Sequence, residues 1–475
     1  MATNHRIEAP GEGVAKTTEA SARRRRVSLI AWVIAAGACV STTAFSFPAL
    51  LVGARLAPRV ELQGGAVAVA RDATHAVLTL VPTWQAARGG PLALVIPVPA
   101  SVQKRQVHFG DDGLMAALES YTAPRIVETD DGTPCPTPEP PPVAGREAPV
   151  TSINPRRVKG LSGEAATLVG RYEQIKIFPP KQAHTLPSWL SRHGYRALTH
   201  VQAAALIRLA KRGYALVVAT AVPRRQGTKK TTGARRLPPL QIAFETPHLT
   251  LPFSLSHSKD EDLRLYGLTR HGRLTVSGVR PSVAPAGDEL PALVLEEPQR
   301  FYRALVDRLH ATPTPTAYLE YAWEGTWCDP CAAPPLAAKT LHALGAYWVD
   351  EQASPPKDNL RLATAVPSAR TQAIFITRYR LLSLAPLTAK TPDLALQESS
   401  DVNEFVERFS VRRPFAGKAT CAGAADYRQA LAKRSASEAE ALARLTGWRV
   451  GDVRHEMGVP ATTKSQDWID GLWND

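Results

Sequence analysis

Apolar residues in this chain recur mainly in short runs rich in valine, leucine and isoleucine, and glycine and proline separate the runs. Such a pattern is typical of β-strands with at least one buried face. It predicts strands at residues 66–70, 75–81, 92–98, 172–178, 214–222, 240–245, 263–268, 274–279, 317–323 and 373–384. Strands 214–222 and 240–245 predict a hairpin with a long loop, and strands 263–268 and 274–279 predict a second hairpin.

Helical periodicity occurs between these runs, at residues 114–121, 186–193, 199–212, 299–311 and 424–445. Thr199 and Gln202 have the spacing of a capping box, and Gly447 follows the last helix, where a glycine commonly ends one. The sequence therefore predicts an α+β fold with mixed, mostly antiparallel sheets, several helices and a long C-terminal helix.

Residues 27–53 form an apolar segment that begins directly after the four arginines Arg23–Arg26. A positive flank followed by an apolar run and small residues is typical of a signal peptide, and cleavage ahead of Phe47 would suit it. The segment is also long enough for an uncleaved transmembrane anchor. Lipid attachment at Cys39 is a weaker match. In each case the rest of the chain is exported to the periplasm or cell envelope, and this segment is its contact with the membrane.

The other boundaries follow from composition. Residues 1–26 read as a disordered basic region, 55–460 as the exported α+β region and 461–475 as a C-terminal tail. Residues 134–163 are rich in proline at their start and lack periodicity, so we expect an irregular excursion within the exported region.

The composition adds a strong basic excess. The 475 residues are 44% apolar and 21% charged, which is normal for a globular protein, and the formal net charge is +14. One basic group lies in a single loop, at Arg224, Arg225, Lys229, Lys230, Arg235 and Arg236. No aromatic residue separates these charges, so we expect a solvated loop and no nucleic-acid partner.

Four cysteines remain for the exported region, which is an even number in a compartment where disulfides persist. They are Cys135, Cys328, Cys331 and Cys421. Four cysteines allow three pairings, and the sequence leaves all three open. We favour Cys328 with Cys331, and Cys135 with Cys421.

Cys328 and Cys331 also suggest a chemistry. The stretch Trp327-Cys328-Asp329-Pro330-Cys331 follows a predicted strand and locally resembles the active-site motif of thioredoxin. That resemblance implies a nucleophilic cysteine in a thiol-disulfide oxidoreductase. Pro334 and Pro335 depart from the motif, because they fall where the helix that lowers the thiol pKa should continue.

Other chemical motifs are missing from the sequence. It contains no nucleophile elbow, zinc-protease pair, P-loop or dinucleotide-binding glycine run, and we expect no cofactor and no metal. The run from His257 to Asp262 reads as a solvated turn, and Asp111-Asp112-Gly113 and Asp130-Asp131-Gly132 read as turns.

Five stretches carry a wider resemblance. They are Leu94–Pro99 with Thr122–Arg125, Tyr172–Phe178 with Trp189-Leu190, Leu237–Glu245, Glu320–Cys331, and Phe375–Arg378 with Arg413-Pro414-Phe415 and Cys421. Together they resemble the domain-of-unknown-function 2330 family of exported bacterial proteins. The resemblance implies export and a shared fold but no activity. The family's cysteine-rich segment after the signal is replaced here by Phe47-Pro48-Ala49.

The sequence thus favours an envelope protein that is a non-enzymatic binding or structural module stabilised by disulfides, with an unidentified ligand or envelope partner. The alternative is a thiol-disulfide oxidoreductase that uses Cys328 and Cys331.

Overall fold

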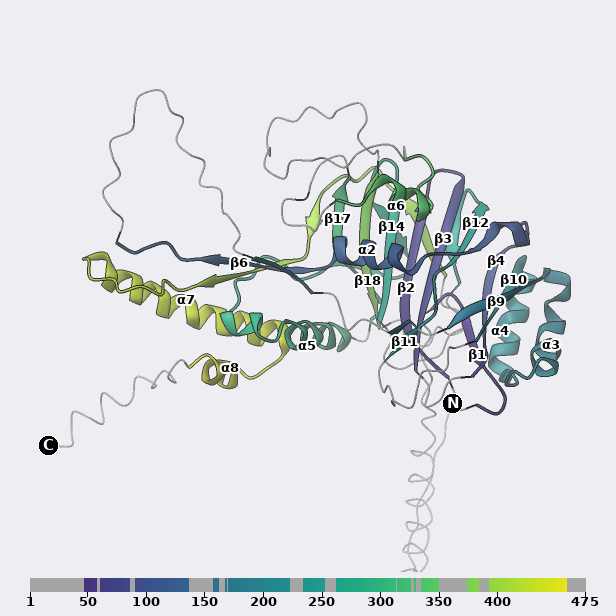
Figure 1. Ribbon diagram of the computed structural model, residues 1–475, viewed down its shortest axis with the longest axis horizontal. Helices are drawn as coiled ribbons and strands as arrows, with labels where there is room; N and C mark the ends of the chain where they lie inside the picture. The colour runs from purple at the N-terminus through teal and green to yellow at the C-terminus, as the bar shows by residue number, and fades with distance from the viewer. Residues whose placement is uncertain are drawn as a thin grey trace, which may run out of the picture. The chain divides into compact units, whose positions relative to one another are not determined.

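The structure is a computed structural model of the chain, and its described residues belong to one compact unit, Thr43–Asp475. The description covers residues 47–57, 60–85, 90–135, 157–161, 167–168, 170–222, 234–252, 262–312, 314–325, 329, 335–349, 374–383 and 393–458. Strands and helices in these ranges form the α+β fold with mixed, mostly antiparallel sheets that the sequence predicts (Figure 1).

Two sheets are central to the unit. The smaller one has the strand order β1-β4-β10-β9 and is antiparallel throughout. Its strands are β1 (Leu50–Gly53), β4 (Leu92–Pro99), β10 (Tyr214–Val222) and β9 (Arg171–Phe178).

The larger sheet has the order β16-β17-β18-β14-β2-β3-β11-β8, with further strands paired to β3 and β17. On this path lie β16 (Arg280–Val283), β17 (Thr316–Glu324), β18 (Phe375–Leu382), β14 (Asp262–Thr269), β2 (Glu61–Arg71), β3 (His75–Gln85), β11 (Arg235–Arg236) and β8 (Thr167–Leu168). The further strands are β12 (Leu240–Glu245), β5 (Val107–Phe109) and β20 (Phe405–Val406).

Two three-stranded sheets complete the β-structure. One has the order β13-β19-β15, formed by β13 (Leu249–Leu251), β19 (Leu394–Glu398) and β15 (Leu274–Ser277). The other has the order β21-β6-β7, formed by β21 (Arg408–Arg413), β6 (Arg125–Asp130) and β7 (Arg157–Gly160).

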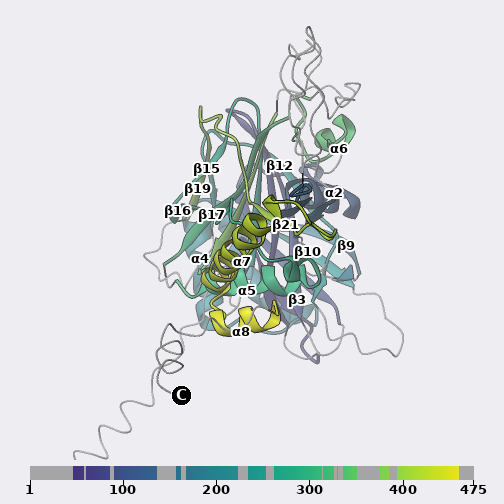
Figure 2. The ribbon, with the colours of Figure 1, turned by 90° about the vertical axis from the view of Figure 1, so that its left-hand side faces the viewer.

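The α-helices are α2 (Asp112–Thr122), α3 (Leu186–Arg192), α4 (His200–Lys211), α5 (Pro298–His310), α6 (Ala338–Ala343), α7 (Gly423–Thr446) and α8 (Val450–Glu456). Short 3₁₀ helices are η2 (Lys104–Gln106), η3 (Pro180–Thr185) and η4 (Ala292–Leu295). Figure 2 shows α7 running along α5 with α8 beside them, and these three helices share a separate apolar core with Phe409 and Val411 of β21.

The order of the layers follows from the alternation of side chains along the strands. In β10, Val217 and Ala219 enter the core between the two large sheets, whereas Leu216 and Val218 pack under α3 and α4. In β2, the valines enter the central core and the alanines face α2 and α6. Helices, a four-stranded sheet, an eleven-stranded sheet and helices therefore form four successive layers.

Most predicted elements are confirmed, with boundaries shifted by a few residues. Thr199 accepts a hydrogen bond from the Gln202 backbone, and the Gln202 side chain returns one, so the capping box is present. The long C-terminal helix is present as α7, and Gly447 ends it with a φ of 77°, a conformation that glycine adopts without strain.

Both predicted hairpins are wrong. Strand β10 pairs with β4 and β9, whereas β12 pairs with β3 and β5 in the other sheet. Likewise β14 pairs with β18 and β2, and β15 pairs with β19. Adjacency in sequence suggested hairpins. The layered core instead buries more apolar surface when each strand lies between partners that are distant in sequence.

The boundary of the predicted export segment needs correction at its C-terminal end. Residues 50–53 of the range 27–53 are strand β1, which pairs with β4, and Phe47 and Ala49 are fully buried. Residues 27–46 lie outside the description. No described helix is long and apolar enough to cross a membrane.

The predicted excursion 134–163 is also partly corrected. Its residues 157–160 form β7, which pairs antiparallel with β6. Residues 1–26 and 461–475 lie outside the description, so the predictions for these two segments stay predictions.

Candidate functional site

Cys135 and Cys421 form a disulfide with their Cα atoms 5.6 Å apart. The bridge ties the segment after β6 to a residue two positions before the start of α7, over a sequence separation of 286. This is one of the two pairings that we favoured. Cys328 and Cys331 lie outside the described residues, so their pairing stays a prediction.

Asp329, which stands between those two cysteines in sequence, is described and buried. Arg125 Nη1 donates a hydrogen bond of 2.5 Å to its Oδ2, and both side chains are 3% exposed. Arg125 also donates to the backbone oxygens of Tyr121 and Ala123. A buried charge needs such partners, so this network holds Asp329 in the interior beside the end of α2.

A second buried network surrounds Glu320 of β17, and sequence reasoning missed it. Arg378 Nε donates to Glu320 Oε2 at 2.5 Å, and Arg380 Nε donates to Oε1. Tyr302 of α5 donates to the same Oε1 at 3.1 Å. All four side chains are almost completely buried, so one carboxylate is fixed between two guanidinium groups.

A β-bulge places Glu320 in this position. The register of β17 against β18 shifts between Leu319 and Tyr321, so Glu320 is the extra residue. Its backbone oxygen accepts a hydrogen bond from the Glu407 N–H at 2.8 Å, so the bulge does not leave this oxygen without a partner. Because of the bulge, Glu320 and Tyr321 both reach the side of the sheet that carries Arg378 and Arg380.

Neighbouring strands extend the network. In register, Arg264 of β14 lies opposite Arg380, and Tyr266 lies opposite Arg378. Arg264 pairs with Glu119 of α2, and Arg380 pairs with Asp262. Arginine side chains of β14 and β18 are therefore paired with carboxylates of β14, β17 and α2 in the region beneath α2.

The ionisation of the two buried glutamates differs. Burial raises the pKa of Glu320, but Arg380 and Arg378 outweigh burial and lower the pKa below its usual range. Glu407, 1% exposed, has a pKa raised well above its usual range by burial and by the charge of Glu320. Glu320 therefore favours the ionised form more than a solvated glutamate does, and Glu407 favours the neutral form. A carboxylate held by two arginines is a poor base, so this network suits a structural role.

A cleft of about 320 Å³ lies at the seam between the four-stranded sheet and the β12–β13 segment. We refer to it as the seam cleft. The apolar and aromatic residues of its wall include Leu78, Pro97, Pro99, Tyr214, Phe244, Leu249 and Leu251. Polar groups at the cleft are Arg212, Thr246, His248 and Thr250. Small-molecule sites combine apolar side chains with polar groups that orient the ligand, and this cleft contains both kinds.

Two interactions cross this seam. The hydroxyl oxygens of Tyr214 and Thr250 lie 2.8 Å apart and join β10 to β13. Arg212 lies over the Tyr214 ring, 5.5 Å from its centroid, and pairs with Asp393. The cleft is thus preformed by contacts between its two sides.

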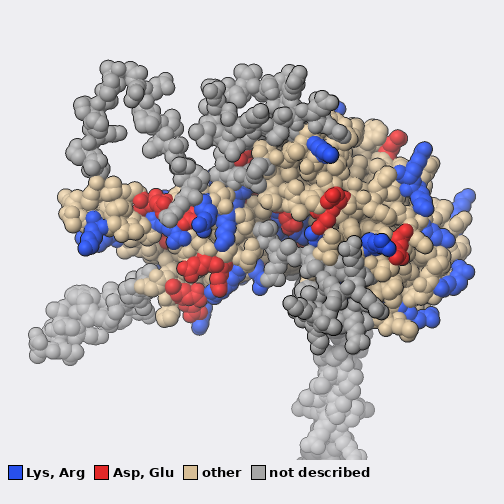
Figure 3. Space-filling view, viewed as in Figure 1, with Lys and Arg blue, Asp and Glu red and all other residues tan. Residues whose placement is uncertain are grey.

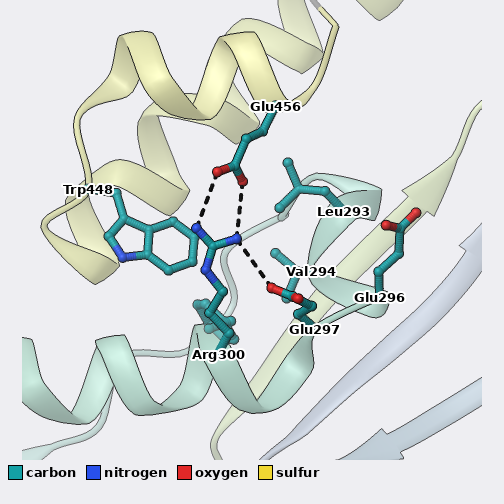
Figure 4. A pocket seen from close by; sticks show the side chains of 8 residues that line it. Leu293, Val294, Glu296, Glu297, Arg300, Trp448 and Glu456 are labelled. Atoms are coloured by element: carbon teal, nitrogen blue, oxygen red, sulfur yellow. Dashed lines mark hydrogen bonds and ion pairs between the residues drawn. The ribbon is translucent and has the colours of Figure 1, made fainter.

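A second cleft, of about 290 Å³, lies between η4, α5 and α8 (Figure 4). Arg300 fills its centre, with its guanidinium carbon 4.6 Å from the centroid of the Trp448 ring. The guanidinium donates to both carboxylate oxygens of Glu456, at 3.2 and 3.4 Å, and to Glu297 at 3.2 Å. The chain's own arginine therefore occupies the cation position of this cleft and joins α8 to α5.

Several predicted polar sites have a different environment from the one expected. Arg236 donates two hydrogen bonds to Asp112, and Arg235 lies over the Trp84 ring, so these two residues do not belong to a solvated loop. The remaining basic residues of that loop lie outside the description. Asp111 caps α2, and Asp131 is partly buried and accepts hydrogen bonds from Arg434 and Tyr427.

The run from His257 to Asp262 is described at its last residue, where Asp262 pairs with Arg380. Among the described side chains, no group of three or more His, Cys, Asp or Glu residues has the arrangement of a metal site.

A sequence signal for the Glu320 network exists. Arg378 and Arg380 alternate within an apolar strand, and Glu320 interrupts another. Opposite charges in two buried strands predict a pair if the strands are neighbours, but the sequence does not reveal the bulge or the strand order.

The fold and these networks define a layered α+β protein with a disulfide and buried ion pairs. The chain belongs to the family described as "uncharacterized protein conserved in bacteria (DUF2330)", whose sequence model matches residues 52–418. The resemblance expected from the sequence is thereby confirmed. No curated protein and no solved structure matches the chain.

Proposed function

We propose that this chain is an exported protein of the bacterial cell envelope, and that its folded unit is a non-enzymatic binding module stabilised by disulfides. The observation that carries the proposal is the disulfide between Cys135 and Cys421. Disulfides form and persist in oxidising compartments and are rare in the cytosol. In a bacterium this chemistry favours the periplasm or cell envelope.

The position of Phe47 supports the same proposal. Its side chain is fully buried, and a Cβ at Gly65 would lie 2.9 Å from the Phe47 ring, so the folded unit needs this residue. Cleavage ahead of Phe47 would leave the core whole. Without cleavage, residues 27–46 would rise about 30 Å as a helix, which matches a bilayer core. Both routes are compatible with the described fold.

The environment of Asp329 favours a structural role for Cys328 and Cys331. In a thiol-disulfide oxidoreductase the reactive pair is accessible to a partner disulfide. Here the residue between the cysteines is 6% exposed and is held by Arg125. We therefore favour binding over redox chemistry and place the ligand in the seam cleft, which contains both apolar and polar side chains.

Export and oxidation are tested in intact cells. Residues 1–60 are fused to a reporter that is active only outside the cytoplasm, and free thiols of the full chain are trapped with N-ethylmaleimide before mass spectrometry. We expect reporter activity and a peptide pair linked through Cys135 and Cys421. A silent reporter and four alkylated cysteines would overturn the proposal.

The redox alternative is tested by the reduction potential of Cys328 and Cys331. A structural bridge has a potential below about −300 mV, whereas a potential near −200 mV is typical of a catalytic pair. We expect the lower value. The higher value, lost in Cys328→Ser, would replace the binding module with an oxidoreductase.

Binding in the seam cleft is tested by ligand-observed NMR with a library of small aromatic and carboxylate fragments. We expect saturation transfer to some fragments that is reduced in Tyr214→Ala. Tyr347→Ala, which removes a tyrosine that is 46% exposed elsewhere, is the matched control. Fragments that bind equally to both variants would place the ligand site outside the seam cleft.

A further inference from the structure

The segment from β9 to β10 is the most one-sidedly charged part of the described chain. Residues 171–222 contain a single acidic residue, Glu173. Their basic residues are Arg171, Lys176, Lys181, Arg192, Arg196, Arg208, Lys211 and Arg212. Figure 3 shows lysines and arginines gathered on the right-hand side of the molecule, where α3 and α4 lie in Figure 1.

Most of these charges have no acidic partner. Within residues 171–222, Arg212 forms an ion pair, with Asp393, and the structure gives no ion pair for the other basic side chains. All of them except Arg196 are exposed. These exposed positive charges therefore produce a positive potential at the surface, and this potential can attract an anionic partner.

The outward side of α4 adds apolar groups to the charges. Ala205, Leu206 and Leu209 face the core, so the opposite side of the helix carries Val201, Ala204, Ile207, Arg208 and Lys211. Val201 is 55% exposed and Ile207 is 40% exposed. A helix side that combines exposed aliphatic residues with arginine and lysine is typical of contact with a lipid surface.

The loop after β1 lies beside this helix pair. The Arg55 N–H donates to the Gly194 oxygen at 2.8 Å, and Arg196 donates from its backbone to Gly53 and from its side chain to Ala57. Leu56, in the same loop, is 98% exposed. We use the term basic face for the surface formed by Arg55, Leu56, Lys181, Arg192, Val201, Ile207, Arg208 and Lys211.

We propose that the basic face docks on the anionic headgroups of a phospholipid bilayer. The proposal rests on export as proposed above, because the apolar residues 27–46 would bring the chain to the membrane. They precede Phe47, which lies three residues before the start of β1, and β1 belongs to the sheet that α3 and α4 cover. The predicted membrane segment is thus connected in sequence to the same sheet that carries the basic face.

A polyanion such as a nucleic acid fits this face less well. Binding of single strands uses exposed aromatic rings on which bases stack. Phe178, Trp189 and Tyr195 are 4%, 7% and 6% exposed and pack in the core under α3 and α4, and Tyr214 is partly buried against the same core. The large apolar side chains exposed on α4, Val201 and Ile207, are aliphatic, which suits the boundary between headgroups and acyl chains.

Hydrogen–deuterium exchange of the full chain tests the docking. The protein is reconstituted into nanodiscs of phosphatidylcholine alone or with 30% phosphatidylglycerol, so an inserted N-terminal segment is present in both samples. We expect slower exchange in residues 199–212 and in residues 54–57 with phosphatidylglycerol. Raising NaCl from 50 to 500 mM should abolish the difference, because salt screens the attraction.

Matched triple variants locate the surface. The first variant combines Arg192→Gln, Arg208→Gln and Lys211→Gln. The control combines Lys418→Gln, Arg428→Gln and Lys433→Gln, which removes the same charge from exposed positions on and before α7. Each basic residue near an anionic surface changes the docking equilibrium by about fivefold, so the first variant should lower it by about 100-fold. The control should keep the protection.

Three outcomes would overturn the proposal. The first would be exchange of residues 199–212 that does not depend on phosphatidylglycerol. The second would be an equal loss of protection in both triple variants. The third would be protection of these residues by DNA but not by the anionic nanodiscs. The salt dependence of the unmodified chain decides the matter even if a variant misfolds. Failure of the export reporter with intact docking would instead overturn the proposed location and leave the lipid-binding surface in place.

Discussion

The structure uses arginine in two opposite ways, in the sheet interior beneath α2 and on the basic face. Arg378 and Arg380 are almost completely buried, and both bind the carboxylate of Glu320. Arg192 and Arg208 are exposed and have no ion pair in the described structure. The side chain is the same, so its environment decides whether it contributes to stability or to a long-range field.

This difference shows what the net charge of +14 means. Arginines in the interior are matched by Glu320, Asp262 and Glu119 and contribute little to the external field. The excess therefore resides in regions such as residues 171–222, where matching carboxylates are missing from the sequence. Local charge balance is a better guide to a binding surface than the total.

The largest effect is expected from Glu320→Gln. The substitution leaves two buried arginines without their shared carboxylate, and breaking a buried ion pair costs about 3–5 kcal/mol. Urea denaturation should show this loss in the free energy of unfolding. Glu324→Gln, at the exposed end of the same strand, is the control and should change stability by less than about 0.5 kcal/mol. Equal losses of stability in both variants would show that the buried network has no special role in stabilising the fold.

The pH dependence of stability tests the state of Glu407. Its pKa is raised in the folded protein, so the unfolded chain releases the proton first as pH rises above about 4.5. Stability should fall by about 1.4 kcal/mol per pH unit from there until the folded protein also releases its proton. Glu407→Gln should remove this slope and raise stability at pH 7. A variant less stable than wild type at pH 7 would show that Glu407 is ionised.

A smaller loss is expected at Asp131, in the region where β6 meets α7. Burial opposes its ionisation, but hydrogen bonds from Arg434 and Tyr427 outweigh burial and lower its pKa. Asp131→Asn should cost about 2–3 kcal/mol at pH 7, because charged hydrogen bonds are lost. The contribution of wild-type Asp131 is complete above about pH 4 and is lost as pH falls through the lowered pKa. Asp288→Asn is the control, since its partner Arg444 is 62% exposed.

The sequence predicts individual elements better than their partners. Apolar runs in β2, β3 and β4 and the capping box of α4 are local signals, and they appear where expected. Pairing is a property of the whole core. Strand β10 binds β9 and β4, which lie on either side of it, although a hairpin with β12 would close a shorter loop. Hydrophobic runs do not encode that choice.

In the candidate sites, too, the residues were easier to predict from the sequence than the partners they contact. The Cys135–Cys421 pair was one of three possible arrangements, and an even cysteine count alone did not select it. The Glu320 network depends on a bulge and on the order of β14, β18 and β17. The excess of charge in residues 171–222 is visible in the sequence, but its lack of partners and the exposure of Ile207 become apparent in the fold.

The smallest effect on stability is expected on the basic face. Arg208→Gln removes a cation near the C-terminal end of α4, which costs about 0.3–1 kcal/mol of favourable interaction with the helix dipole. It also relieves repulsion from Lys211 and Arg212, so the two terms oppose each other. We expect a net change below about 0.5 kcal/mol in urea denaturation, with a further decrease at 500 mM NaCl because salt screens both terms. A loss above about 1 kcal/mol would mean that Arg208 is held by a carboxylate, and the contrast with Arg380 would then disappear.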